Sequence, residues 1–150
     1  MRLGLSTVTA TLLMMLSCAP AEAESTLTGT SWRLTEIQSM DDVQGTVLVP
    51  EAQRYTVTLE GRSDGEGRAS FQIDCNRGSS SWRATPSESG ESGLLSFGPL
   101  ATTQMACPPG SLDQRVTTAL ASVRTYLIQD GRLHLSQFAD SGILTWIPAA

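Results

Sequence analysis

The chain has 150 residues, a formal net charge of −5 and one histidine, and all ten of its basic residues are arginine. The acidic balance, without a basic cluster, argues against nucleic acid and against anionic lipid surfaces as partners. The lack of lysine excludes Schiff-base chemistry and lysine general bases, and a single histidine leaves little material for a His-built metal site.

An N-terminal leader precedes the rest of the chain. Arg2 is followed by an apolar run over residues 3–16, and Ala21-Glu22-Ala23 fits the small-x-small rule for cleavage before Glu24. The run Met15-Leu16-Ser17-Cys18 also resembles a bacterial lipobox, which would make Cys18 the lipidated first residue after a signal of residues 1–17, although a lipobox usually has Leu where Met15 stands. The apolar run of about 14 residues is shorter than the roughly 20 that a spanning helix needs. Export is predicted, and a signal peptide of residues 1–23 and a lipid anchor at Cys18 both stay open.

After a polar tether of residues 24–28, a single domain is expected over residues 29–148. Apolar and polar residues alternate in its first half, which predicts strands over 32–37, 54–60 and 69–75, with shorter strands around Trp82 and over 95–97. Segments 38–52, 61–67 and 86–93 are rich in turn formers and are expected to be loops. The acidic loop 61–67 lacks the EF-hand spacing, so we interpret it as a solvated turn.

The two cysteines outside the leader, Cys75 and Cys107, are predicted to form a disulfide. Exported proteins occupy an oxidising compartment in which two cysteines usually pair. A reactive thiol or half of a metal site is the alternative, but neither a C-x2-C spacing nor a histidine cluster is present. Because Ala69, Phe71, Ile73 and Cys75 are in phase, we expect the Cys75 sulfur to face the core. Closing the loop between the cysteines should stabilise the fold by about 3–4 kcal/mol.

One helix is predicted near residues 111–124. Ser111 and Gln114 have the spacing of a capping box, and apolar residues recur at helical spacing. These apolar residues are Leu112, Val116, Ala119, Leu120 and Val123.

The C-terminal third has the pattern of a β-meander. Strands are predicted over 125–129 and 132–136 across the turn Asp130-Gly131, and over 143–147 after a second turn. The whole pattern predicts an α+β fold with a mainly antiparallel sheet of about seven to eight strands, roll-like or barrel-like, and one packed helix.

Catalytic motifs are not evident. A Cys–His dyad would need His134, which alternates with Leu133 and Leu135 and is therefore expected to face solvent. Neither a nucleophile elbow, a P-loop nor a Rossmann glycine pattern occurs, and the carboxylates are scattered. We predict a protein without catalytic residues, metal or cofactor.

Candidate contact residues are Asn76, Arg77 and Gln104, which adjoin the two cysteines. Arg77 is suited to bind a carboxylate on a partner, and the alternative is that it holds a turn at residues 76–78 through local carbonyls. Gln104 and Met105 are expected first as a turn residue and a plug of the core. The three tryptophans are expected in the core rather than around a ligand cavity. They are Trp32, Trp82 and Trp146.

At these residues the chain resembles the META domain family, which includes the heat-shock-induced HslJ proteins. The resemblance covers residues 27–148, and its most specific run is Ala101-Thr102-Thr103-Gln104-Met105-Ala106-Cys107-Pro108. Gln104 stands where an Arg is common in the family, and Asp74 where a Gly is common. The other matching runs are Gly29-Thr30-Ser31-Trp32-Arg33-Leu34, Asp74-Cys75-Asn76-Arg77-Gly78, Ile143-Leu144-Thr145-Trp146 and the region 120–135.

The resemblance implies a compact α+β domain found in bacterial envelope proteins, often lipoproteins, with links to heat shock, novobiocin resistance, and secretion or motility. It implies neither an enzyme activity nor a cofactor, and it makes the cysteine and Asn-Arg motifs structural positions. We therefore expect a non-catalytic protein of the bacterial periplasm or cell envelope that supports stress tolerance through contact with an envelope protein or the cell surface. The alternatives are a carrier of small apolar ligands, and an inhibitor that plugs the cleft of an envelope hydrolase with residues 76–81. The sequence indicates no oligomeric state.

Overall fold

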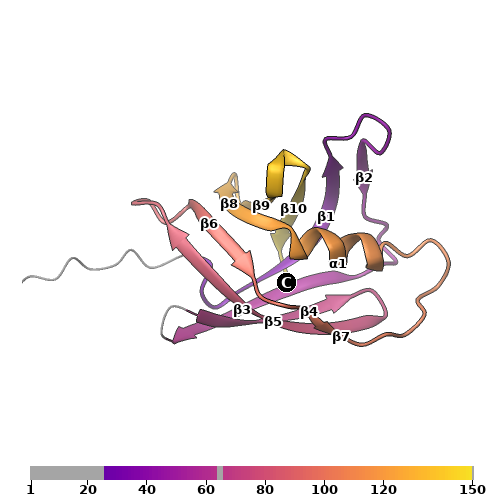
Figure 1. Cartoon of the computed structure of the whole chain (residues 1–150), viewed down its shortest axis with the longest axis horizontal. Helices are drawn as coiled ribbons and strands as arrows, with labels where there is room; N and C mark the ends of the chain where they lie inside the picture. Colours follow the sequence, from indigo (N-terminus) through magenta and orange to yellow (C-terminus); the bar gives the residue numbers. More distant parts are fainter. Residues whose placement is uncertain (1–25, 64–65, 150) are drawn as a thin grey trace, which may run out of the picture.

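The computed structural model describes residues 26–63 and 66–149 (Figure 1). The leader, with Cys18 and the expected cleavage site after Ala23, lies outside the described residues, as do Asp64 and Gly65 of the acidic loop. The two routes of leader processing therefore stay predictions.

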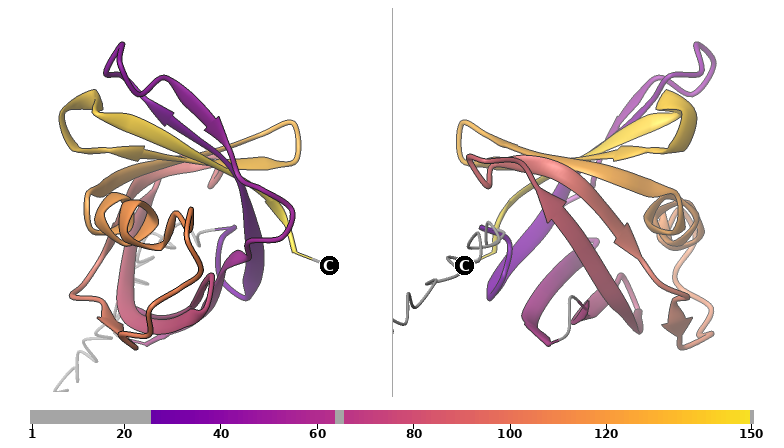
Figure 2. Two further views of the ribbon diagram at one scale, coloured as in Figure 1. Left: turned by 90° about the vertical axis from the view of Figure 1, so that its right-hand side faces the viewer. Right: turned by 60° about the vertical axis from the view of Figure 1, so that its left-hand side comes forward.

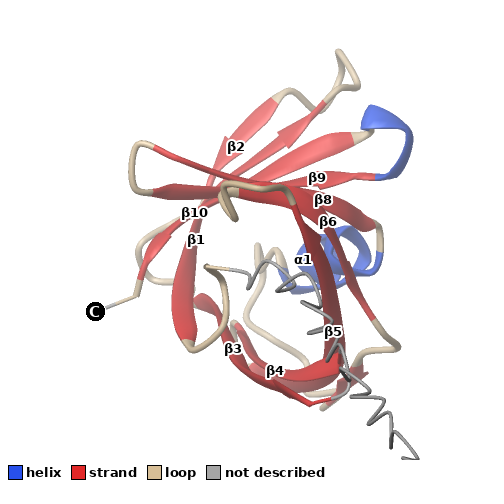
Figure 3. Cartoon of the chain, turned by 90° about the vertical axis from the view of Figure 1, so that its left-hand side faces the viewer, coloured by secondary structure: helices blue, strands red, loops and turns tan. Residues whose placement is uncertain are grey.

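Eight antiparallel strands form a closed barrel (Figures 2 and 3). Each strand pairs with the next around the ring, and β10 pairs back with β1, from Trp32 opposite Pro148 to Ser39 opposite Gly142. Closure leaves the ring without a free edge. In ring order the strands are β1 (Thr30–Ser39), β3 (Tyr55–Ser63), β4 (Glu66–Ile73), β5 (Asn76–Pro86), β6 (Ser92–Phe97), β8 (Val123–Gln129), β9 (Arg132–Gln137) and β10 (Gly142–Pro148).

Two short strands extend the ring. β2 (Thr46–Leu48) pairs with the second half of β1, beyond the residues that pair with β3, and β7 (Ala101–Thr102) pairs with the start of β5. A single 3-10 turn, η1 (Phe138–Asp140), joins β9 to β10. The predicted mainly antiparallel, barrel-like fold with one helix is confirmed.

The barrel interior is filled by apolar side chains. Trp82 and Trp146 are 0% and 1% exposed, Trp32 is 6% exposed, and the rings of Phe71 and Phe97 pack edge to face with centroids 5.3 Å apart. The tryptophans therefore lie in the core.

Helix α1 (Asp113–Ala121) packs at one side of the barrel (Figure 3) and is shorter than predicted. Val116, Ala119 and Leu120 face the core, whereas Val123 already belongs to β8. No helix among the described residues has both the length and the apolar character that crossing a membrane requires.

The expected capping box at the start of α1 is wrong. Leu112 occupies the N-cap position and makes no side-chain cap bond. The Ser111 hydroxyl instead donates to Asp74 Oδ2 at 2.6 Å, and the Leu112 N–H donates to the Tyr55 hydroxyl at 2.9 Å. The Ser111 oxygen also accepts from the Asp113 N–H at 3.3 Å, so contacts with Asp74 and Tyr55 add to one local bond at the start of α1.

Four further expectations are wrong at or near the strand ends. Segment 38–52 contains the end of β1 and all of β2, and the strands β3 and β4 extend into segment 61–67. Asn76 pairs with Ile73, so residues 76–78 begin β5 and the turn is Asp74-Cys75. Asp74 has a φ of 54°, a conformation that aspartate tolerates better than most residues. Cys75 is consequently a half-buried turn residue, not a core-facing strand residue.

Candidate functional site

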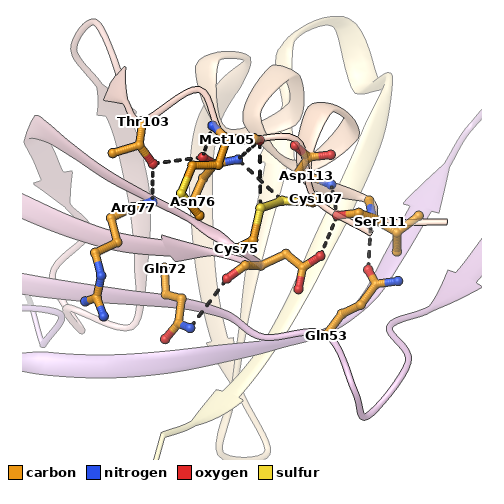
Figure 4. The surroundings of a disulfide bond; sticks show 12 residues. Gln53, Gln72, Cys75, Asn76, Arg77, Thr103, Met105, Cys107, Ser111 and Asp113 are labelled. Atoms are coloured by element: carbon orange, nitrogen blue, oxygen red, sulfur yellow. Dashed lines mark hydrogen bonds between the residues drawn. A yellow bond between two sulfur atoms is a disulfide. The ribbon is translucent and has the colours of Figure 1, made fainter. Parts of the chain in front are cut away.

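A disulfide joins the β4–β5 turn to the segment that leads into α1 (Figure 4). Cys75 and Cys107, whose Cα atoms lie 5.4 Å apart, are the predicted partners. We call residues 103–107, between β7 and this bond, the braced loop. The bond fixes the far end of the braced loop to the barrel wall.

Asn76 holds the braced loop from below (Figure 4). Its Nδ2 donates to the Met105 carbonyl at 3.0 Å and to Cys107 Sγ at 3.4 Å. Its Oδ1 accepts from the Met105 N–H and from the Thr103 hydroxyl, both at 2.8 Å. A side-chain amide offers two donor hydrogens and two acceptor lone pairs, and these contacts use all four. Asn76, expected as a contact residue, is 5% exposed and serves to position the loop.

The start of the braced loop continues the pairing of β5 with β7. The Arg77 N–H donates to the Thr103 hydroxyl at 3.0 Å, and the Thr103 N–H donates to the Arg77 carbonyl at 2.9 Å. The Arg77 side chain is exposed and points away from the disulfide (Figure 4). It makes no hydrogen bond or ion pair with the described part of the chain, so it does not hold a turn through local carbonyls.

The outer face of the braced loop is exposed. Met105 is 59% exposed, so the expectation that it plugs the core is wrong. Gln104 is also exposed, and its Nε2 donates to the Thr102 hydroxyl at 3.1 Å. The loop thus combines a fixed backbone with outward-facing side chains.

A hollow of about 440 Å³, which we call the loop groove, separates the braced loop from α1. Ile73 and Asn76 form part of its lining, and α1 contributes Asp113, Gln114, Thr117 and Thr118. These side chains supply hydrogen-bond donors and acceptors and a single carboxylate. The groove is suited to binding through hydrogen bonds.

Gln53 and Tyr55 fasten the beginning of α1 beside this groove. Gln53 Oε1 accepts from the Tyr55 hydroxyl at 2.7 Å and from the Leu112 N–H at 3.1 Å, and its Nε2 donates to the Gly110 carbonyl at 2.9 Å. Burial raises the pKa of the Tyr55 hydroxyl above its usual value, although its bonds with Ser111 and Leu112 oppose the shift. Sequence reasoning missed Gln53, because one amide in an irregular segment leaves no pattern.

Nucleophilic and metal chemistry find little support in the described part of the chain. Both cysteine sulfurs are in the disulfide. His134 lies on the outer face of β9 as expected, between the buried Leu133 and Leu135, and is half-exposed with its Nδ1 3.2 Å from the Thr145 hydroxyl. No three His, Cys, Asp or Glu side chains among the described residues gather where they could hold a metal ion.

Comparisons with known proteins give one family and one structural likeness. The model of the META domain matches residues 25–149. None of the curated proteins matches the chain. A crystal structure of a DUF4847 family protein from Bacteroides vulgatus ATCC 8482 is similar at 12% identity and a TM-score of 0.47, covering 79% of this chain and 92% of that one.

Proposed function

This chain belongs to the META domain family, and from that premise we propose that it is an exported, non-catalytic protein that supports stress tolerance of the bacterial envelope. It acts by presenting the braced loop to another envelope protein. The observation that carries the proposal is the contrast between the fixed backbone of the braced loop and the exposed side chains of Gln104 and Met105.

A braced loop binds well because little conformational entropy is left to lose on association. Asn76 and the disulfide fix the backbone before a partner arrives. Met105 offers an exposed, adaptable apolar side chain that a partner can bury, and Gln104 beside it offers an amide. Arg77, whose backbone pairs with Thr103 at the start of the loop, adds an exposed positive charge that has no partner in the described part of the chain.

The two alternatives receive less support. The tryptophans that a carrier would use to line a ligand cavity are buried in the core, and none of them lines the loop groove. Residues 76–81, the expected inhibitory loop, lie within β5 and pair with β4, so they do not protrude. An inhibitory role would have to use the braced loop instead.

Site-specific photo-crosslinking in the bacterial host tests the proposal. A photoreactive residue at position 104 is compared with one at Arg132, an exposed residue at the β8–β9 turn, in cells under heat or novobiocin stress. We expect the same envelope protein to be captured in repeated experiments at position 104 and not at position 132.

A matched pair of variants links that contact to function. Met105→Asp and Leu94→Asp each place a charge at an exposed apolar position, and Leu94 lies on β6, opposite Thr85 near the far end of β5 from Asn76. We expect Met105→Asp to lose both the crosslink and the stress tolerance, and Leu94→Asp to keep both. Equal behaviour of the two variants, with both folded, would contradict the proposal.

A further inference from the structure

A second groove lies on the other flank of α1. Gln114 and Thr118 border both grooves, whereas Arg115 and Ala119 face only the second, which has a volume of about 330 Å³. Its opposite wall comes from the end of β1, the β1–β2 connection and the β9–β10 connection. We call this hollow the Arg115 groove.

The lining of the Arg115 groove is polar and, apart from the arginine, uncharged. Ile37 and Ala119 are its apolar members, and the rest carry side-chain amides or hydroxyls. Carboxylates lie close to the lining in sequence at Asp41, Asp113 and Asp140, but none of them lines the groove or forms an ion pair with Arg115. Asp41 accepts from Gln44 Nε2 at 3.4 Å and from the Val43 N–H at 2.9 Å. The amide and hydroxyl members are Gln38, Ser39, Gln44, Gln114, Thr118, Gln137 and Ser141.

The Arg115 guanidinium lacks a hydrogen-bond acceptor at one of its enclosed nitrogens. Its Nη2 is enclosed and has no hydrogen-bond acceptor in the described part of the chain, although the residue as a whole is half-exposed. An enclosed charged donor without an acceptor is unfavourable, because its hydration is lost without replacement. In a chain of net charge −5, this guanidinium has no carboxylate within its groove.

We propose that the Arg115 groove binds an acidic sugar, with the sugar carboxylate held by the Arg115 guanidinium. A guanidinium presents parallel N–H groups that match the two oxygens of a carboxylate. A lining with one cation suits a monoanion better than a phosphate dianion, since no second positive side chain is present in the groove. Because Nη2 is enclosed, side chains around it have to shift when the carboxylate binds.

The remaining lining fits the rest of such a ligand. Side-chain amides and hydroxyls both donate and accept, which is the requirement for binding a ring that carries several hydroxyl groups. The volume is at the lower end of small-molecule sites and suits a single sugar unit. This site goes beyond the proposed protein contact, because it does not use the braced loop.

Two pairs of sugars provide a test in which only the carboxylate changes. The ¹⁵N-labelled protein is titrated with N-acetylmuramic acid against N-acetylglucosamine, and with glucuronic acid against glucose. We expect saturable shifts of the Arg115 Nε–H and of the side-chain amides of Gln38 and Gln137 with both acids, and at least tenfold weaker binding of both neutral sugars. Inorganic phosphate serves as a third arm and should bind more weakly than the acids.

Arginine variants complete the test. Arg115→Gln should weaken binding of both acids at least tenfold, Arg115→Lys should weaken it less, and Arg132→Gln, at an exposed position outside the groove, should leave it unchanged. The proposal is overturned if neither acid causes shifts, if the neutral sugars bind equally well, if phosphate binds more tightly, or if folded Arg115→Gln binds like the parent. The sugar pairs on the unmodified protein decide the matter even if a variant does not fold.

Discussion

Asn76 lies beneath Met105 and pairs with both backbone polar groups of that residue, accepting from its N–H and donating to its carbonyl. A side chain thus takes the place of a neighbouring strand for a residue outside the sheet. Loops normally satisfy their backbone groups with water, which leaves them mobile. Here the backbone groups of Met105 bond to Asn76 in the barrel wall, and this fixes the loop to the sheet.

Replacing Asn76 by alanine should therefore destabilise the fold. The change removes four hydrogen bonds and leaves the Met105 and Thr103 polar groups without their partner, so we expect the free energy of unfolding to fall by about 2–4 kcal/mol. Urea unfolding measures the loss. Gln104→Ala removes an exposed side chain of the same loop and should change stability by less than about 0.5 kcal/mol. Equal effects of the two variants would contradict the bracing role of Asn76.

Removing the disulfide should lower the free energy of unfolding, because the unfolded chain gains conformational entropy when the cross-link is absent. Its cysteines are 32 residues apart, for which the chain-entropy model gives about 3–4 kcal/mol. The variant Cys75→Ala/Cys107→Ala, compared with the oxidised parent by urea unfolding, measures this contribution. We also expect hydrogen exchange of the Met105 amide to rise less in this variant than in Asn76→Ala, because its bond to Asn76 Oδ1 stays. Faster exchange without the disulfide than without Asn76 would make the covalent bond the main brace.

Gly67 should not tolerate a side chain. A Cβ at this position would lie 2.3 Å from Trp82 Nε1 and 2.9 Å from the Glu60 carbonyl oxygen, inside a packed region. We expect Gly67→Ala to destabilise the fold by about 1–3 kcal/mol through overpacking. Gly61→Ala is the matched control on the neighbouring strand, since nothing lies within 4 Å of its Cβ position. A smaller loss for Gly67→Ala than for Gly61→Ala in thermal unfolding would refute the packing argument.

The Tyr55 hydroxyl should make stability fall at high pH. Its pKa is raised in the folded state by burial, so the folded protein holds this proton more tightly than the unfolded chain. The contribution is fully present below the unfolded pKa of about 10 and is lost as the pH rises from there through the higher folded pKa. The chain has two tyrosines, so Tyr126→Phe leaves Tyr55 as the sole phenol for a spectroscopic titration. A midpoint at or below that of the unfolded chain would contradict the expectation.

Alternation along the chain is enough to predict most strands, but not where they turn. The phase of Ala69, Phe71 and Ile73 continues arithmetically to Cys75, because a two-residue turn does not interrupt a period of two. The pattern therefore placed a turn cysteine in the core. In the same way, the local signal at Ser111 could not reveal that its hydroxyl donates to Asp74, which lies 37 residues earlier.

The candidate sites depend on contacts that no local pattern encodes. The two cysteines are identifiable from composition and from the compartment that the sequence predicts, and their neighbours Asn76 and Gln104 from proximity in sequence. The division of roles between them, one buried and one exposed, follows from the register of β5 against β7. The Arg115 groove requires the ring to close before its walls meet.

The pairing of β10 with β1 also determines when folding can finish. Ser31 near the beginning of the domain accepts a hydrogen bond from the backbone of Ala149, so the earliest strand waits for the final one. A growing chain therefore keeps two unpaired edges until β10 has been made. Until β10 pairs, the free edges of β1 and β9 are open to pairing with other chains, so a chain without β10 is expected to aggregate.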